Sequence, residues 1–245
     1  MTYTHVLITR PQPEAGELQA CLADLPLAPV VLPAYGFSEL TPGQEIEEFQ
    51  SSRGRKLVIF TSKRSVSYGL PAIPSALLKD ATLAAIGPAT AALLESNGAP
   101  VSLIPEGGFT SEDLLAAPEL CEKPGAALVV TAPGGRTALA RGLAALGWTV
   151  RVTHVYRRDN LELPGREVER LLSARAVISA WTSENAIRGL AARLPEAAWQ
   201  LICKGPAIVT SERLGRVMAE MGGTACRVAG GPGNEAISRE VRKLV

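Results

Sequence analysis

The sequence predicts an α/β protein of two similar domains, each a parallel sheet flanked by helices. Short runs rich in Val, Ile, Leu and Ala alternate with stretches of helical periodicity along the chain of 245 residues. The predicted strands are apolar almost throughout, which suits burial on both faces of a parallel sheet. The motifs also recur after about 120 residues, which indicates duplication of a whole domain rather than a solenoid.

The strands and helices can be followed in order along the first copy, where each apolar run precedes a helical stretch. The expected pairs are VLIT (6–9) with PEAGELQACLADL (13–25), LVIF (57–60) with KRSVSYGL (63–70), and LAAIG (83–87) with ATAALLESNG (89–98). Gly98 and Gly147 stand where the C-terminal signals of helices are expected, before the next strand begins.

The internal repeat is visible in five matches that keep the same order and nearly the same spacing. They are LVIFTS (57–62) with ISAWTS (178–183), VLIT (6–9) with LVVT (128–131), Tyr35 with Tyr156, Thr90 with Ser211, and SEDL (111–114) with NEAI (234–237). Single matches of this kind arise by chance, but an ordered set favours two diverged copies of one unit.

Composition excludes several classes of function. The net charge is +1, with 25 Lys and Arg against 24 Asp and Glu, so no basic block is available to bind nucleic acid. The four cysteines lie far apart without a C-x-x-C motif, and the histidines are His5 and His154. This pattern predicts neither a zinc site, nor a disulfide framework, nor a histidine-based catalytic triad. Any chemistry is expected to proceed without histidine, metal or cofactor.

The chain is expected to be cytoplasmic. Its start lacks the pattern of a signal peptide, and no window reaches the ~18 uninterrupted apolar residues that a membrane helix needs. The glycine-rich stretches GGRT (134–137) and GGPGN (230–234) fit neither the GxGxxG nor the Walker A spacing. We interpret both as turns and do not predict nucleotide binding.

Hydroxyl residues follow the predicted strands of both copies. In open parallel sheets, ligands bind outside the carboxyl ends of the strands, where free N–H groups of the next helix attract anions. Ser62, Thr90, Ser183 and Ser211 stand at such ends. Each is equally well explained as a helix cap, because Ser and Thr are favoured there for that reason alone.

Seven motifs together resemble the uroporphyrinogen-III synthase family over nearly the whole chain. They are TRP (9–11), FTSKRSV (60–66), AIGPATAALLESNG (85–98), FTSEDLL (109–115), GGRTALARGLAALGWTVRVTHVYRR (134–158), WTSENA (181–186) and SERLGRVMAEMGG (211–223). The resemblance implies a cofactor-independent hydro-lyase of tetrapyrrole (haem and sirohaem) biosynthesis. Such an enzyme cyclises hydroxymethylbilane with loss of water and inverts the last pyrrole ring through a spiro intermediate.

The resemblance also implies a particular division of the chain. Residues 1–34 and 160–245 would form one domain and residues 38–153 the other. Residues 35–37 and 154–159 would be two linker strands, with the substrate cleft between the domains. The protein is expected to be a monomer that receives hydroxymethylbilane, its small-molecule substrate, from the preceding enzyme of the pathway, without a nucleic-acid or membrane partner.

The family motifs imply site residues as well. The substrate-binding set is Arg10, Ser62, Arg64, Thr90, Ser183, Thr210 and Ser211. Thr210 and Ser211 are alternatives, because the second domain has IVTSERLG where the first has the G-x-x-T turn, and a Gly205-Pro206 pair stands earlier. Tyr156 corresponds to the tyrosine that helps the hydroxyl leave, although a strand tyrosine that only packs would give the same sequence.

A different class of protein shares the predicted architecture. A two-domain, hinged small-molecule binding module of the periplasmic-binding type also has duplicated α/β halves around a ligand, and fold alone does not choose between it and a synthase.

Overall fold

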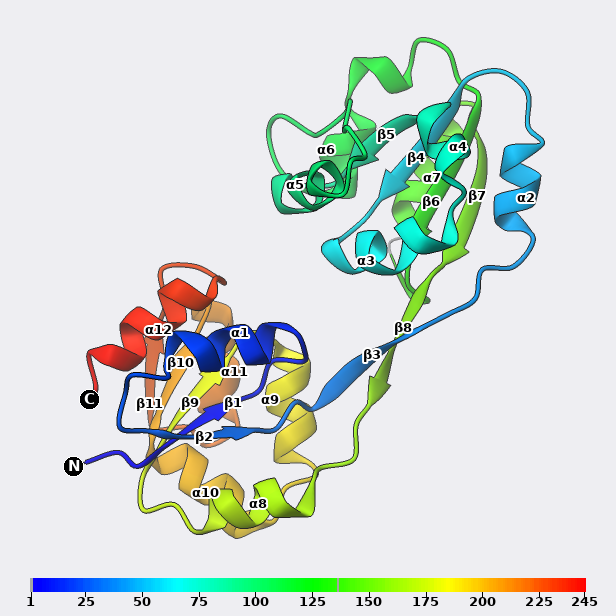
Figure 1. Cartoon of the computed structure of the whole chain (residues 1–245). Helices are drawn as coiled ribbons and strands as arrows, with labels where there is room; N and C mark the ends of the chain where they lie inside the picture. The colour runs from blue at the N-terminus through cyan, green and yellow to red at the C-terminus, as the bar shows by residue number, and fades with distance from the viewer. Residues whose placement is uncertain (1, 136) are drawn as a thin grey trace. The chain divides into compact units, whose positions relative to one another are not determined.

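The structure, a computed structural model, describes residues 2–135 and 137–245. It divides into two compact units. Unit 1 consists of Met1–Gly36 and Asp159–Val245, and unit 2 consists of Phe37–Arg158. Each unit is a parallel sheet flanked by helices, so the predicted fold class is confirmed (Figure 1). No helix in the described ranges has both the length and the apolar character to cross a membrane.

Unit 1 contains a five-stranded sheet in the order β11-β10-β9-β1-β2, in which all pairs are parallel. The strands are β1 (His5–Ile8), β2 (Ala28–Val31), β9 (Val177–Trp181), β10 (Pro206–Val209) and β11 (Ala225–Val228). The blue N-terminal strand β1 therefore lies beside the yellow strand β9, far away in sequence (Figure 1). This placement joins the two separate stretches of unit 1 into one sheet.

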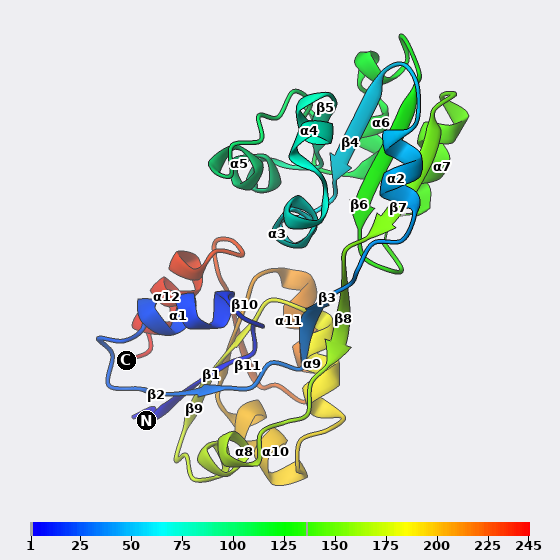
Figure 2. The ribbon, with the colours of Figure 1, turned by 45° about the vertical axis from the view of Figure 1, so that its right-hand side comes forward.

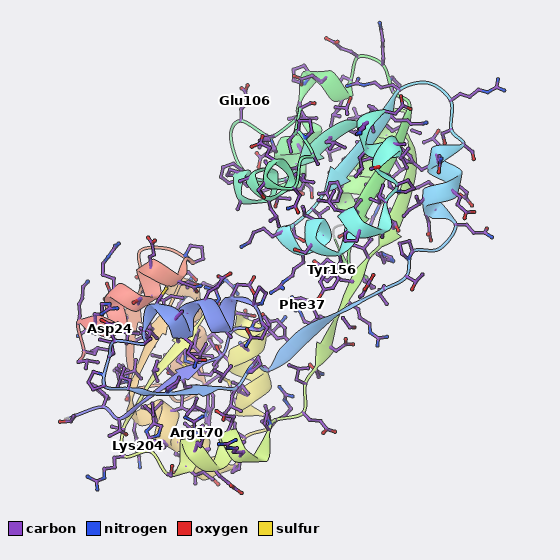
Figure 3. The ribbon with its side chains drawn as sticks, viewed as in Figure 1. Asp24, Phe37, Glu106, Tyr156, Arg170 and Lys204 are labelled. Carbon is purple, nitrogen blue, oxygen red and sulfur yellow. The ribbon has the colours of Figure 1, made fainter. Side chains whose placement is uncertain are left out.

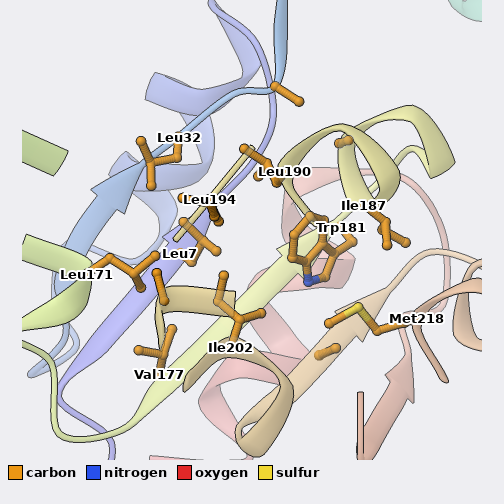
Figure 4. Close-up of a cluster of buried hydrophobic side chains, with 14 of the residues drawn as sticks. Leu7, Leu32, Leu171, Val177, Trp181, Ile187, Leu190, Leu194, Ile202 and Met218 are labelled. Atoms are coloured by element: carbon orange, nitrogen blue, oxygen red, sulfur yellow. The ribbon is translucent and has the colours of Figure 1, made fainter. Parts of the chain in front are cut away.

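The two faces of this sheet are covered by different helices. One face carries α1 (Glu14–Cys21) and α12 (Asn234–Arg242), and the other carries α8 (Gly165–Leu172), α9 (Glu184–Ala191), α10 (Glu196–Lys204) and α11 (Glu212–Glu220). Successive side chains of β1 alternate between the faces, as a strand requires. Trp181 is fully buried in the core beneath α8, α9, α10 and α11 (Figure 4). Its indole N–H donates a 2.8 Å hydrogen bond to Ser179 Oγ.

Unit 2 contains a four-stranded parallel sheet in the order β5-β4-β6-β7, which an isolated bridge from Ala84 to Leu103 extends beyond β5. Its strands are β4 (Lys56–Phe60), β5 (Thr82–Ala85), β6 (Ala126–Thr131) and β7 (Thr149–His154). Every residue of β6 is buried, as expected for the centre of a parallel sheet.

Helices again cover both faces of this sheet (Figure 2). One core is shared by α2 (Glu45–Gln50), α3 (Lys63–Ala72), α4 (Ser75–Lys79) and α5 (Pro88–Ser96), and the other by α6 (Ser111–Leu115), the 3₁₀ turn Pro118–Leu120 and α7 (Thr137–Ala145). Gly98 and Gly147 follow α5 and α7 with φ of 75° and 91°. The predicted helix ends are therefore confirmed, because this left-handed conformation favours glycine.

A third, two-stranded sheet is formed by β3 (Tyr35–Glu39) and β8 (Tyr156–Asn160). The chain passes from unit 1 to unit 2 within β3 and returns within β8. Within unit 2, the backbone N–H of Leu40 donates to the carbonyl of Val155 at 3.0 Å, so the two ends of this unit are tied together.

The sheet orders confirm the internal repeat. β7-β6-β4-β5 of unit 2 corresponds strand for strand to β2-β1-β9-β10 of unit 1. One predicted match is wrong. Ser211 is the N-cap of the helix after β10, but the N-cap at the same place after β5 is Gly87, and Thr90 lies three residues further on inside α5. The Gly87-Pro88 pair at this helix start corresponds to Ser211-Glu212 of the other copy.

Candidate functional site

Apart from Tyr156, which lies on β8, the candidate residues follow the carboxyl ends of strands in the two parallel sheets. In unit 2 the order of connection reverses between β4 and β6, and in unit 1 it reverses between β9 and β1. Such reversal points open a crevice between the two loops that leave the adjacent strands. Ser62 follows β4, and Arg10 and Ser183 follow β1 and β9. The fold therefore places predicted site residues at the reversal point of both units.

Ser62 is a structural cap as well as a candidate ligand residue. Its Oγ accepts the backbone N–H of Ser65 at 3.1 Å, while Ser65 Oγ accepts the N–H of Ser62 at 3.0 Å. This reciprocal pair is a capping box and fixes the first turn of α3. The capping interpretation of Ser62 is thus confirmed, and the cap holds its hydroxyl in one place.

Tyr156 lies directly against this cap. Its phenol oxygen is 3.2 Å from Ser62 Oγ, a distance at which either hydroxyl can donate. The ring stacks on Tyr68 with centroids 5.6 Å apart and meets Phe37 edge-on at 5.7 Å. Phe37 and Tyr156 are labelled on strands β3 and β8 in Figure 3. Tyr156 is half-buried, so packing and a polar contact together hold the phenol in place.

Arg64 extends the same cluster. Its guanidinium carbon lies 4.5 Å from the centroid of the Phe37 ring, which is a cation–π contact. The hydroxyl of Tyr68 donates to the backbone carbonyl of Phe37 at 3.2 Å. Phe37 and Tyr68 were missed by the sequence reasoning. The spacing of Arg64 and Tyr68, one helical turn apart on α3, was a signal that both face the same side.

A hollow of about 300 Å³ opens beside Tyr156 within unit 2. Its walls are Phe37, Tyr156, Arg158 and the loop Thr131–Gly135. Thr61 and Thr131 join the ends of β4 and β6 at the adjoining reversal point. Thr61 Oγ1 lies 3.1 Å from both the Val130 carbonyl and Thr131 Oγ1. The sequence reasoning missed Arg158 and Thr131, although Arg158 stands two residues after Tyr156 in the same strand.

The glycines of this loop have a structural reason. Gly134 has a φ of 72°, and a Cβ on Gly135 would lie 2.5 Å from Thr131 Oγ1 and 2.8 Å from the Ala132 carbonyl oxygen. The predicted turn is thus confirmed, and it also forms a wall of the hollow. Arg136, inside the same sequence motif, lies outside the described residues.

Thr90 stands apart from this cluster. It occupies the third position of α5, after the next strand of the sheet, and is 7% exposed. Its backbone N–H donates to the carbonyl of Gly87 at 3.0 Å. The capping role considered for Thr90 is wrong, because Gly87 is the N-cap of this helix.

In unit 1, Arg10 is held by the loop that leads into α12. Its Nη1 donates to the Pro232 carbonyl at 2.9 Å and to Asn234 Oδ1 at 2.8 Å. Asn234 in turn donates to Glu17 on α1 at 3.0 Å. This network links the ends of β1 and β11 and fixes the guanidinium at the carboxyl edge of the sheet.

The hydroxyls of unit 1 differ in what they bind. Ser211 caps α11, and its Oγ accepts the backbone N–H of Leu214 at 3.4 Å. Ser183 is the N-cap residue of α9, but its side chain makes no capping hydrogen bond. Thr210 is half-buried and precedes Ser211 at the end of β10. The capping interpretation is therefore confirmed for Ser211 and wrong for the Ser183 side chain.

A charged network lies next to Ser183. The carboxylate of Glu184 accepts Arg188 Nε at 2.8 Å and also binds Arg213, and these contacts hold its pKa below the usual range. Arg188 also binds Glu220 at 3.1 Å. These arginines are neutralised by carboxylates of their own unit. Within the described residues, no group of three or more His, Cys, Asp or Glu side chains could hold a metal ion.

Comparisons with known proteins identify the family of the chain. The family model described as "Uroporphyrinogen-III synthase HemD" matches residues 16–238. The uroporphyrinogen-III synthase of Escherichia coli (strain K12) is 29% identical over 97% of this chain and 99% of its own length.

Solved structures show the same fold at lower identity. The chain resembles uroporphyrinogen-III synthetase from Helicobacter pylori 26695, with a TM-score of 0.64, 18% identity and coverage of 99% of this chain and 100% of the other. It resembles a mutant uroporphyrinogen III synthase from Thermus thermophilus with a TM-score of 0.58, 17% identity and 98% coverage of both chains. The alternative of a periplasmic-type binding module is not supported. Because the family model spans most of the chain, this protein belongs to the uroporphyrinogen-III synthase family.

Proposed function

We propose that this protein is a uroporphyrinogen-III synthase that converts hydroxymethylbilane into uroporphyrinogen III with loss of one water and inversion of ring D. The observation that carries the proposal is the family match across residues 16–238. The reaction breaks one carbon–oxygen bond and the carbon–carbon bond that first holds ring D, and it forms two new carbon–carbon bonds. The hydroxyl leaves as water with the proton that ring D loses, so there is no net change in oxidation level. The reaction therefore needs no redox partner, and we propose a hydro-lyase that acts without a cofactor.

The polar groups at the strand ends suit such a substrate. Hydroxymethylbilane carries eight carboxylates, and a chain of net charge +1 cannot neutralise them all with its side chains. Hydroxyls and the free N–H groups of helix starts can hydrogen-bond carboxylates instead. Arg10 and Arg64 would supply charge-assisted contacts, one in each unit. Ser183 would use the hydroxyl that its helix does not employ.

The two alternatives at the end of β10 can be separated on physical grounds. Ser211 Oγ already accepts a backbone N–H of its own helix. We therefore assign the ligand contact to Thr210 rather than to Ser211. Ser62 would act mainly through Tyr156, because its hydroxyl lies between the α3 cap and the phenol. Thr90 is buried, so it would contribute at most a minor contact with the substrate at the start of α5.

Tyr156 is the proposed catalytic residue. Its phenol would donate a proton to the hydroxyl that leaves as water, while the pyrrole chain supplies the electron pair for ring closure. The contact with Ser62 and the two flanking rings hold the phenol in one position, as such a donor requires. Much of the remaining task is conformational, because the linear substrate also cyclises unaided to the type I isomer.

The decisive experiment is an isomer assay. Purified protein receives freshly generated hydroxymethylbilane, and the oxidised porphyrins are separated by chromatography. We expect the type III isomer with the protein and type I in buffer alone, with no added metal or nucleotide. A protein that yields type I alone would contradict the proposed function.

A further inference from the structure

Strand β8 presents two neighbouring arginines to opposite sides. Side chains alternate along a strand, so Tyr156 and Arg158 share one face and Arg157 lies on the other. The contacts agree with this alternation. Arg158 and Tyr156 both line the hollow of about 300 Å³, whereas Arg157 Nε donates to Ser38 Oγ at 3.2 Å. The two arginines are therefore equal in charge but different in surroundings.

The hollow has the walls of a small anion-binding site. Among the described residues that line it, Arg158 is the one with a charged side chain. The backbone of Ala132–Gly135 forms the opposite wall, and glycines at 134 and 135 leave that backbone bare of side chains. Phe37 and Tyr156 supply apolar surface, so a ligand with a carboxylate on a short carbon chain matches both kinds of wall. The volume suits one acidic side chain or one pyrrole ring, not a whole tetrapyrrole.

We propose that this hollow binds one carboxylate-bearing side chain of the tetrapyrrole, with Arg158 as its binding residue. The inference rests on the proposed function, and it names a contact that the family motifs did not. A guanidinium can hold a carboxylate through two parallel hydrogen bonds, which fixes the orientation of the ligand as well as its position. A side chain anchored there places the adjoining pyrrole beside the Tyr156 phenol. Arg158 is thus a positioning residue for the reacting end of the substrate.

The test compares two substitutions with the same change in charge, Arg158→Gln and Arg157→Gln. Arg157 lies outside the proposed site, so its variant is the matched control. Affinity for uroporphyrinogen III is measured by anaerobic equilibrium dialysis across a salt series, together with kcat and KM for hydroxymethylbilane. We expect Arg158→Gln to weaken binding and raise KM by about 10-fold, with a smaller effect on kcat and a shallower salt dependence. Arg157→Gln should stay within about 2-fold of wild type.

A third variant separates the charge of the side chain from the geometry of its hydrogen-bond donors. Arg158→Lys keeps the charge and most of the stem but loses the planar pair of donors, so its affinity should lie between wild type and Arg158→Gln. Equal affinities for Arg157→Gln and Arg158→Gln would overturn the inference, as would full affinity in all three variants. These outcomes are distinct from failure of the proposed function, in which the wild-type protein itself would yield only the type I isomer.

Discussion

Removing one oxygen atom from Tyr156 separates its two interpretations. Tyr156→Phe keeps the ring that stacks on Tyr68 at 5.6 Å and meets Phe37 at 5.7 Å. It deletes only the phenol hydroxyl that lies 3.2 Å from Ser62 Oγ. The variant therefore tests the hydroxyl with little change in packing.

The two interpretations predict effects of different size. A hydrogen bond of this kind contributes about 0.5–1.5 kcal/mol to stability, and Ser62 Oγ keeps the Ser65 N–H as a partner in the variant. The melting temperature should therefore fall by a few degrees at most. A well-placed proton donor contributes about 10²–10⁴-fold to turnover, which corresponds to about 2.7–5.5 kcal/mol of activation free energy. The catalytic interpretation thus predicts a large loss of turnover beside a small loss of stability, whereas the packing interpretation predicts the small loss of stability alone.

The assay measures initial rates of type III formation alongside thermal unfolding of both proteins. We expect a loss of turnover of at least about 100-fold, a nearly unchanged affinity for uroporphyrinogen III, and the small change in melting temperature given above. A variant that is slightly less stable but turns over at the wild-type rate would refute the catalytic assignment and leave Tyr156 as a packing residue. Ser62→Ala gives a useful comparison, because it removes the neighbour of the phenol together with the α3 cap.

Two further predictions concern the loop and a surface ion pair. Gly135→Ala should destabilise the protein by about 1–3 kcal/mol and raise KM, because its Cβ would lie 2.5 Å from Thr131 Oγ1, whereas Gly107→Ala, with open space around it, should be silent. Urea unfolding and kinetics check both variants, and a fully stable Gly135→Ala would show that the loop relaxes freely. Asp24 binds Arg242 through both of its carboxylate oxygens, and this hydrogen bonding to Arg242 is the main reason its pKa is lowered. A lowered folded-state pKa stabilises the protein above the unfolded pKa, and that contribution is lost as pH falls through the folded pKa. The urea midpoints of wild type and Asp24→Asn should therefore differ at pH 7 and converge in acid, and a gap that persists in acid would contradict the assignment.

The layers of the fold were predictable because the residues of each strand indicate that both of its faces are buried. Runs such as LVIF (57–60) and AALVV (126–130) are apolar at every position, and the structure buries them on both faces. The capping role of Ser62 was also within reach, since it depends on residues within one turn. Local chemistry of this kind can be inferred from a few adjacent letters.

The composition of the site was less predictable, because it depends on contacts between distant segments. Tyr156 meets Ser62, Tyr68 and Phe37 only through the pairing of β3 with β8 and the packing of α3. No spacing in the sequence encodes these contacts. For Thr90 the sequence was misleading, because matching Thr90 to Ser211 by residue type misaligned the two helix starts. The strand ends align Ser211 with Gly87, and only the backbone reveals that correspondence.

The parallel pairing of β1 with β9 has a consequence for the order in which the protein folds. One edge of β1 pairs with β2, which follows it closely in sequence, but the other edge pairs with β9, where His5 lies opposite Val177, and that partner is synthesised much later. Unit 2 is continuous in sequence and can form in the meantime. When it does, the pairing of its two ends brings the flanking segments close together and shortens the loop that β1 must close. We therefore expect unit 2 to acquire protection from hydrogen exchange first during refolding, and the strands of unit 1 to follow it.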